Sequence, residues 1–184
     1  MKIPLCKPSI TNQDIRVITK SLKSGWLTHG PENLKFESNF NKHIKSKYSL
    51  SMNSCTSALE CSIKCLEKKG EIIVPSFTWV SSANAIINTG CKPVFVDIDL
   101  NTRNIDPKKI EKNISKSTIA IMVVHFSGLP CDMDPILSLC KKYNLSLIED
   151  SAETLGAKYK NKYTGSFGLG CFSFFPTKNI TTTE

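Results

Sequence analysis

Residues 119–124 read IAIMVV and residues 93–98 read PVFVDI, two almost unbroken apolar runs in a chain of 184 residues. A strand with one face in water alternates apolar and polar residues, whereas a continuous apolar run is typical of a strand covered on both faces. Such strands occur in parallel sheets that carry helices on either side. These two segments therefore predict an α/β protein with a mostly parallel sheet.

Outward from these two strands, the apolar periodicity changes repeatedly between the extended and the helical type. We expect strands at Glu71–Val74, Pro93–Ile98, Ile119–Phe126, Leu145–Glu149 and Gly170–Phe175, a strand-turn at Ala157–Tyr163, and a short strand marked by Tyr48, Leu50 and Met52. We expect helices at Trp79–Ile87 and Pro107–Ile114, after the capping box of Thr11 and Asp14, and around the apolar stripes that contain Phe36, Leu59 and Met133. No repeat or linker divides the chain, so we expect one α/β layer structure.

The composition is that of a soluble globular protein, with 40% hydrophobic and 22% charged residues. The longest apolar stretch, Ile119–Val124, is far too short to span a membrane, and no signal-peptide pattern opens the chain. We therefore expect a cytoplasmic protein that has no membrane partner.

The net charge of +8 comes from 24 basic and 16 acidic residues, but only Arg16 and Arg103 are arginine. Arginine is the side chain that most often reads base edges and phosphates, and the lysines are spread along the chain, so nucleic-acid binding is not expected. The eight cysteines include no CxxC pair and no His or Cys pair at zinc-finger spacing. We therefore expect reduced thiols and no metal site.

Ligands of parallel α/β sheets bind beyond the carboxyl ends of the strands, so the residues that follow each predicted strand are site candidates. The hydroxyl-rich turn Asn53–Ser57 opens a helix and is either an anion site or a plain helix cap. Trp79 also starts a helix, where its ring either stacks on a flat ligand or anchors the core. Asp150 ends an apolar strand, where an unpaired carboxylate is costly. Lys178 follows the last strand.

These four features match the four needs of one cofactor. Pyridoxal phosphate requires an anchor for its phosphate, an aromatic plate against its ring, a carboxylate at its pyridine nitrogen and a lysine that forms a Schiff base. The sequence therefore predicts pyridoxal 5′-phosphate as the cofactor.

Seven ordered motifs make the chain similar to the sugar aminotransferases of the DegT/DnrJ/EryC1/StrS family. They are SGWLTHGP, NSCTSAL, PSFTWVSSANAI, PVFVDID, VVHFSGLPCDMD, EDSAETLGA and FSFFPTKNITTTE, and the resemblance runs from Ile3 to Glu184. The resemblance implies the large domain of a type I aminotransferase, with a mostly parallel sheet flanked by helices.

The resemblance also assigns roles by position. Lys178 matches the lysine that binds the cofactor covalently, Asp150 matches the carboxylate on the pyridine nitrogen, and Trp79 matches the aromatic residue stacked on the ring. The residues that match the phosphate site are Thr56, Ser57 and Ser173. Glu153, also expected to bind the cofactor, stands where relatives often have Gln or His, so its role is open.

The implied reaction moves an amino group from L-glutamate to a keto-sugar nucleotide, with Lys178 as the proton carrier. A 4-keto sugar is favoured over a 3-keto sugar, and the product would serve surface polysaccharide or amino-sugar biosynthesis. Relatives of this kind are homodimers in which the partner supplies part of the phosphate site, so we expect a homodimer at full length.

Relatives continue well beyond the position of Glu184. We therefore expect residues 1–184 to be the N-terminal part of the large domain, without the C-terminal domain, and to be inactive alone. Two alternatives stay open. One is a keto-sugar dehydratase of the same fold, in which His replaces the Schiff-base lysine, and Lys178 argues against it. The other is a truncated, non-catalytic remnant or regulator.

Overall fold

A parallel sheet of five strands forms the centre of the computed structural model, which describes residues 2–4 and 6–182; the last two residues of the final motif, Thr183 and Glu184, lie outside the described residues. The strands are β1 (Glu71–Pro75), β2 (Lys92–Val96), β3 (Thr118–Val124), β4 (Ser146–Asp150) and β7 (Leu169–Cys171). Their order is β2-β1-β3-β4-β7, and every neighbouring pair is parallel. The predicted fold class is therefore confirmed.

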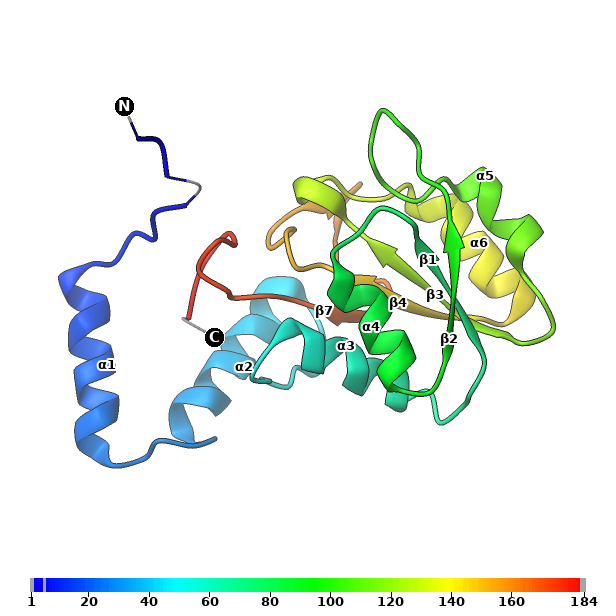
Figure 1. Ribbon diagram of the computed structural model, residues 1–184. Coiled ribbons are helices and arrows are strands. Elements are labelled where there is room, and N and C mark those ends of the chain that lie inside the picture. The colour runs from blue at the N-terminus through cyan, green and yellow to red at the C-terminus, as the bar shows by residue number, and fades with distance from the viewer. Residues whose placement is uncertain (1, 5, 183–184) are drawn as a thin grey trace.

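Helices cover both faces of this sheet (Figure 1). They are α3 (Cys55–Lys64) and α4 (Val80–Asn88) on one face, and α5 (Pro107–Ile110) and α6 (Met133–Tyr143) on the other. The side chains of β1 divide between the two layers: Ile72 and Val74 pack in the core that contains α3 and α4, and Ile73 packs in the core that contains α5 and α6. Because both faces are buried, the strands need no polar alternation.

The smaller elements refine the expected pattern. The predicted helix at Pro107–Ile114 ends as a separate 3₁₀ turn, η1 (Glu111–Asn113), and a second turn, η2 (Phe126–Gly128), follows β3. The strand-turn expected at Ala157–Tyr163 is an antiparallel hairpin of β5 (Lys158–Tyr159) and β6 (Lys162–Tyr163). Within residues 2–4 and 6–182, no helix is long and apolar enough to cross a membrane.

Two helices precede the sheet, α1 (Asn12–Ser24) and α2 (Pro31–Ile44). The predicted capping box starts α1: Thr11 Oγ1 accepts a hydrogen bond from Asp14 N, and Thr11 N donates to Asp14 Oδ2. The helix ends at Gly25, which takes a left-handed φ of 72°. None of the side chains of α1 is buried, and the helix stands away from the sheet (Figure 1).

The prediction of a short strand at Tyr48, Leu50 and Met52 is wrong. This segment forms no strand in the described chain, and Tyr48 and Leu50 are 77% and 65% exposed. It is hydrogen-bonded to α2 instead, because the N–H and the hydroxyl of Ser51 both donate to Glu37 Oε1, over 2.7 and 2.8 Å. Alternating residues predict a strand only where a neighbouring strand accepts and donates the backbone hydrogen bonds.

A cavity of about 1070 Å³ separates this segment and α2 from β7. Aromatic contacts tie α2 to the chain beyond β7, with Phe36 edge-on to Phe174 and Phe40 edge-on to Phe172, at ring-centre distances of 5.1 and 5.0 Å. The sheet edge formed by β7 therefore faces an open, largely apolar space.

Candidate active site

The candidate site lies at the edge of the sheet where β1, β3, β4 and β7 end. Because these strands are parallel, their carboxyl ends meet at one edge, and the segments that follow them start there. The start of α4 follows β1, His125 follows β3, Asp150 ends β4, and the segment with Lys178 follows β7. Residues far apart in sequence are thus brought to a common edge.

Asp150 is the best-defined member of this group, with an exposure of 5%. Ser82 Oγ donates to its Oδ2 over 2.8 Å, and the N–H of Ala152 donates to its Oδ1 over 3.2 Å. Burial raises the pKa of the Asp150 carboxyl, while the two hydrogen bonds and the nearby charge of Lys178 oppose that rise. A buried carboxylate of this kind is typical of a functional site.

Lys178 pairs with Glu153, whose role the sequence left open. Lys178 Nζ lies 3.1 Å from Glu153 Oε1, and the second oxygen, Oε2, accepts the N–H of Ser127 over 2.8 Å. Ser127 and Gly128 both take left-handed backbone conformations, with φ of 51° and 85°. Glu153 thus links the lysine to the turn η2.

Trp79 is the N-cap residue of α4 and is 77% exposed. A side chain this exposed does not anchor the core, so that alternative is wrong. The indole stands at the start of the same helix whose third residue, Ser82, holds Asp150. Its stacking on a ligand ring stays a prediction.

Thr56 and Ser57 lie in the first turn of α3, as expected. Ser54 is the N-cap residue, and its Oγ accepts the N–H of Ser57 over 3.1 Å and lies 3.0 Å from the Ser57 hydroxyl. The turn therefore acts as a helix cap, and its role as a phosphate site stays a prediction. Ser173 accepts the N–H of Phe175 over 3.3 Å in the segment before Lys178.

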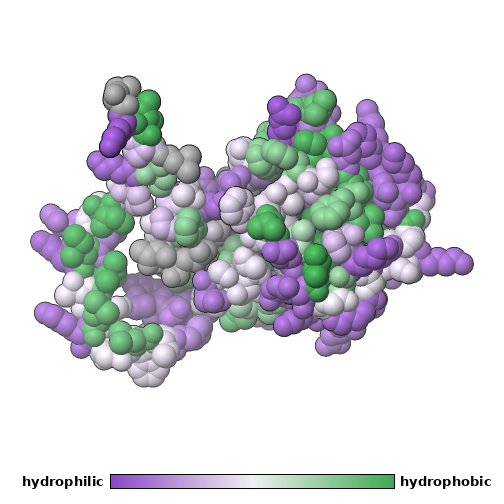
Figure 2. Space-filling view, viewed as in Figure 1, coloured by the Kyte–Doolittle hydropathy of each residue, from purple (hydrophilic) through white to green (hydrophobic). Residues whose placement is uncertain are grey.

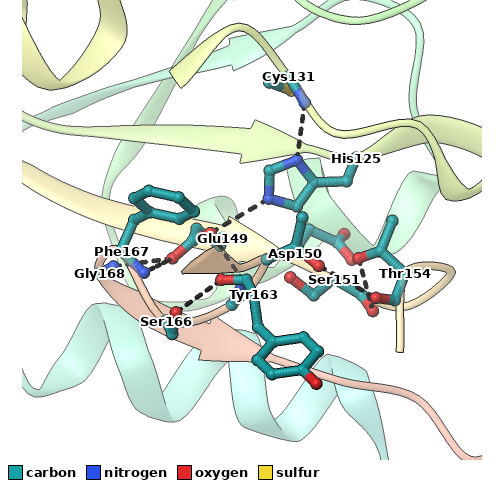
Figure 3. Close-up of polar contacts among 12 residues, drawn as sticks. His125, Cys131, Glu149, Asp150, Ser151, Thr154, Tyr163, Ser166, Phe167 and Gly168 are labelled. Carbon is teal, nitrogen blue, oxygen red and sulfur yellow. Dashed lines mark hydrogen bonds and ion pairs between the residues drawn. The ribbon is translucent and has the colours of Figure 1, made fainter. Parts of the chain in front are cut away.

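Sequence analysis assigned no role to two buried residues, Glu149 and His125, that hold the edge together (Figure 3). Glu149 Oε1 accepts the N–H groups of Phe167 and Gly168, and Oε2 accepts the N–H of Gly165, each over 2.7 Å. The turn 165–168 is thereby fixed to β4, and β7 follows it directly.

His125 completes this buried group through both of its ring nitrogens. Nδ1 accepts the N–H of Cys131 over 3.0 Å, so Nε2 carries the ring proton and donates to Glu149 Oε2 over 3.2 Å. The signal for Glu149 was present in the sequence, because a charged residue inside a strand buried on both faces must be paired. Its partners, backbone groups of a distant turn, leave no such signal.

By its parallel sheet and covering helices, this chain has the large-domain fold of type I aminotransferases. The chain belongs to the DegT/DnrJ/EryC1/StrS aminotransferase family, whose family model matches residues 8–184.

Two curated relatives cover nearly the whole chain. The spore coat polysaccharide biosynthesis protein SpsC of Bacillus subtilis is 41% identical over 185 residues, which are 99% of this chain and 48% of that protein. The UDP-4-amino-4-deoxy-L-arabinose–oxoglutarate aminotransferase of Shewanella sediminis is 38% identical over 184 residues, 99% of this chain and 47% of that enzyme. The chain thus spans about half the length of these relatives.

Two solved structures match the described fold over the whole chain. The PLP form of the putative sugar aminotransferase Spr1654 of Streptococcus pneumoniae has a TM-score of 0.92 and 32% identity, and 52% of its length is covered. The GDP-4-keto-6-deoxy-D-mannose-3-dehydratase of Escherichia coli, with bound hydrated PLP, has a TM-score of 0.94 and 34% identity, and 49% of its length is covered. The fold alone therefore does not separate amination from dehydration.

Proposed function

We propose that this protein, at full length, is a pyridoxal-phosphate-dependent aminotransferase that moves an amino group from L-glutamate to a keto-sugar nucleotide. The observation that carries the proposal is the presence of a buried, doubly hydrogen-bonded Asp150 at the same sheet edge as Lys178, whose charge acts on the Asp150 carboxyl. Family membership supports the transaminase class.

The residues present fit the cofactor. A pyridinium nitrogen is a cation that needs an anionic acceptor, and the buried Asp150 carboxylate offers one that is already oriented by Ser82 and Ala152. The exposed indole of Trp79, at the start of the helix that contains Ser82, leaves a flat face available. When bound, pyridoxal phosphate supplies an electron sink that stabilises negative charge on the carbon next to the amino group.

Residues of the chain itself attach the cofactor, transfer the proton and bind the phosphate in this proposal. Lys178 Nζ would attach the cofactor and, once released from it, would carry the proton of the L-glutamate α-carbon to the cofactor's C4′ carbon. In the second half-reaction it would carry a proton the opposite way, from C4′ to the sugar carbon that receives the amino group. Glu153, 3.1 Å from Nζ, would keep the released Lys178 side chain in the site. In this proposal Thr56, Ser57 and Ser173 bind the phosphate.

The proposed acceptor is a 4-keto sugar nucleotide, and the proposed product serves surface polysaccharide or amino-sugar biosynthesis. The names of SpsC and of the Shewanella enzyme support this choice. The dehydratase alternative requires His at the Schiff-base position, and Lys178 supports the aminotransferase instead. We also propose a homodimer, which light scattering coupled to gel filtration would test.

The protein would be incubated with pyridoxal phosphate, reduced with borohydride and digested. The cofactor should label the peptide that contains Lys178. L-Glutamate and a UDP-4-keto sugar should then give 2-oxoglutarate and amino sugar. Lys178→Ala should abolish both results, whereas Lys116→Ala, at an exposed lysine, should change neither. Amination that persists in Lys178→Ala would refute the proposal.

A further inference from the structure

The hydroxyl of Ser82 is a buried polar group that takes no direct part in the proposed reaction. Ser82 lies in the first turn of α4 with an exposure of 0%, and its Oγ is 2.8 Å from Asp150 Oδ2. The two residues are 68 positions apart in sequence, so the contact joins α4 to the end of β4. It is a contact between the helix that carries Trp79 and the strand that carries the carboxylate.

A second hydroxyl fixes the direction of this hydrogen bond. Thr78 Oγ1 lies 2.8 Å from Ser82 Oγ. Serine has one hydroxyl proton, and an ionised carboxylate only accepts hydrogen bonds, so the Ser82 proton points to Asp150. Thr78 must then donate to Ser82, which gives an ordered chain of donors from Thr78 to Ser82 to Asp150. Chained hydrogen bonds of this kind polarise and strengthen one another.

We propose that Ser82, supported by Thr78, is a positioning residue that holds the Asp150 carboxylate ionised and in one orientation for the cofactor's pyridine nitrogen. This inference rests on the proposed function. With Ser82 on Oδ2 and the N–H of Ala152 on Oδ1, the carboxylate cannot rotate without losing both hydrogen bonds. The first turn of α4 thus sets two things together, the place of the indole of Trp79 and the charge of Asp150.

The chain offers well-matched variants. Ser82→Ala removes the hydroxyl and Ser82→Thr keeps it. Ser81→Ala makes the same chemical change one residue away, at a side chain that is only partly buried. Thr78→Ala removes the supporting donor from a partly buried position and leaves the Ser82 hydroxyl in place. Circular dichroism and thermal melts of the cofactor-free proteins would show which variants fold.

The test uses the full-length protein with pyridoxal phosphate that carries ¹⁵N at the ring nitrogen. Its NMR shift reports whether that nitrogen is protonated, a property that a purely structural role would not change. Ser82→Ala should move the signal toward neutral pyridine and weaken cofactor binding about tenfold, as expected for a lost hydrogen bond to a charged group. Thr78→Ala should shift it less, in the same direction, whereas Ser82→Thr and Ser81→Ala should match the wild type.

An unchanged nitrogen signal in Ser82→Ala would overturn the inference; should that variant not fold, an unchanged signal in Thr78→Ala decides in the same way. A double-mutant cycle gives a second reading, since in the Asp150→Asn background the loss of the Ser82 hydroxyl should no longer affect binding. If the wild type itself fails to be labelled at Lys178 after borohydride reduction, the proposed function fails. Labelling of the wild type together with an unaffected Ser82→Ala would refute this inference alone.

Discussion

Asp150 illustrates how one side chain sets conflicting demands on folding and on function. Its carboxylate is nearly buried, and burial is the largest influence on its pKa, which lies above the ordinary value near 3.8. Hydrogen bonds from the Ser82 hydroxyl and the Ala152 N–H and the charge of nearby Lys178 oppose this effect. They reduce the cost of the charge but do not remove it.

The first prediction concerns the pH dependence that follows from this raised pKa. A folded-state pKa above the unfolded value contributes stability that is complete below the unfolded pKa and is lost as the pH rises through the folded pKa. At neutral pH, which lies above the unfolded pKa, the raised pKa of Asp150 therefore costs stability in the cofactor-free protein. Asp150→Asn should raise the melting temperature at pH 7, and the gain should vanish as the pH falls to about 4. A variant that melts below the wild type at pH 7 would contradict this.

The second prediction concerns Ser151, the neighbour of Asp150. Its Oγ is buried and has no hydrogen-bond partner among the described residues, and an unsatisfied buried hydroxyl costs folding free energy. Ser151→Ala should therefore raise the free energy of unfolding by about 1 kcal/mol. The control is Ser166→Ala, whose hydroxyl donates to Tyr163 O over 2.6 Å, and which should lose about 1 kcal/mol. Urea unfolding of both variants measures the difference.

At the scale of elements, the connection from β4 to β7 depends on one side chain. Glu149 has a fully buried side chain, which accepts hydrogen bonds from three N–H groups of the turn 165–168 and from His125. Regular secondary structure supplies none of these bonds. The pairing of β4 with β7, and with it the approach of Lys178 to Asp150, rests on this carboxylate.

The third prediction is therefore that Glu149→Ala is severely destabilising. It leaves the buried N–H of Gly165 and the partly buried N–H groups of Phe167 and Gly168 without their acceptor, and the expected loss is about 3–5 kcal/mol in the free energy of unfolding. Glu111→Ala, which removes an exposed partner of Lys142, should have little effect. Comparable melting temperatures for the two variants would show that the turn is held by something else.

The sequence predicted the sheet well and the site in part, for reasons that differ by element. The buried strands and the covering helices have strong periodicity, so β3 and α6 lie close to where apolar residues placed them. The segment at Tyr48 alternates in the same way yet forms no strand, because alternation does not reveal whether a neighbouring strand is present. Asp150 was recognisable at its strand end, whereas Ser82 was not, since its partner lies 68 positions away.

At the scale of the whole molecule, the described chain leaves apolar surface uncovered. On α1, Ile15, Ile18 and Leu22 are each more than half exposed, and green atoms run along this helix in Figure 2. The apolar cavity beside β7 adds to this surface. Apolar patches of this kind are typical of surfaces that pack against other protein.

The fourth prediction follows from that surface. The 184-residue chain in isolation should self-associate as its concentration rises and should bind a hydrophobic dye. Ile18→Lys combined with Leu22→Lys should reduce both effects without lowering the melting temperature, because α1 has no buried side chain. Asn12→Lys with Gln13→Lys adds the same charge off the stripe and should not. Gel filtration with light scattering gives the answer, and a monomer at every concentration would contradict it.

The hydrogen bonds that Glu149 accepts from the turn 165–168 also affect how fast this turn exchanges its amide protons. Amides in an irregular turn normally exchange their protons with solvent quickly, because small local openings expose them. The amides of Gly165, Phe167 and Gly168 are bound to a buried carboxylate between two strands (Figure 3). They open only when β4 and β7 separate, so this turn should exchange with deuterium as slowly as the sheet itself. By its exchange rate, this irregular turn would then be grouped with the core of the protein.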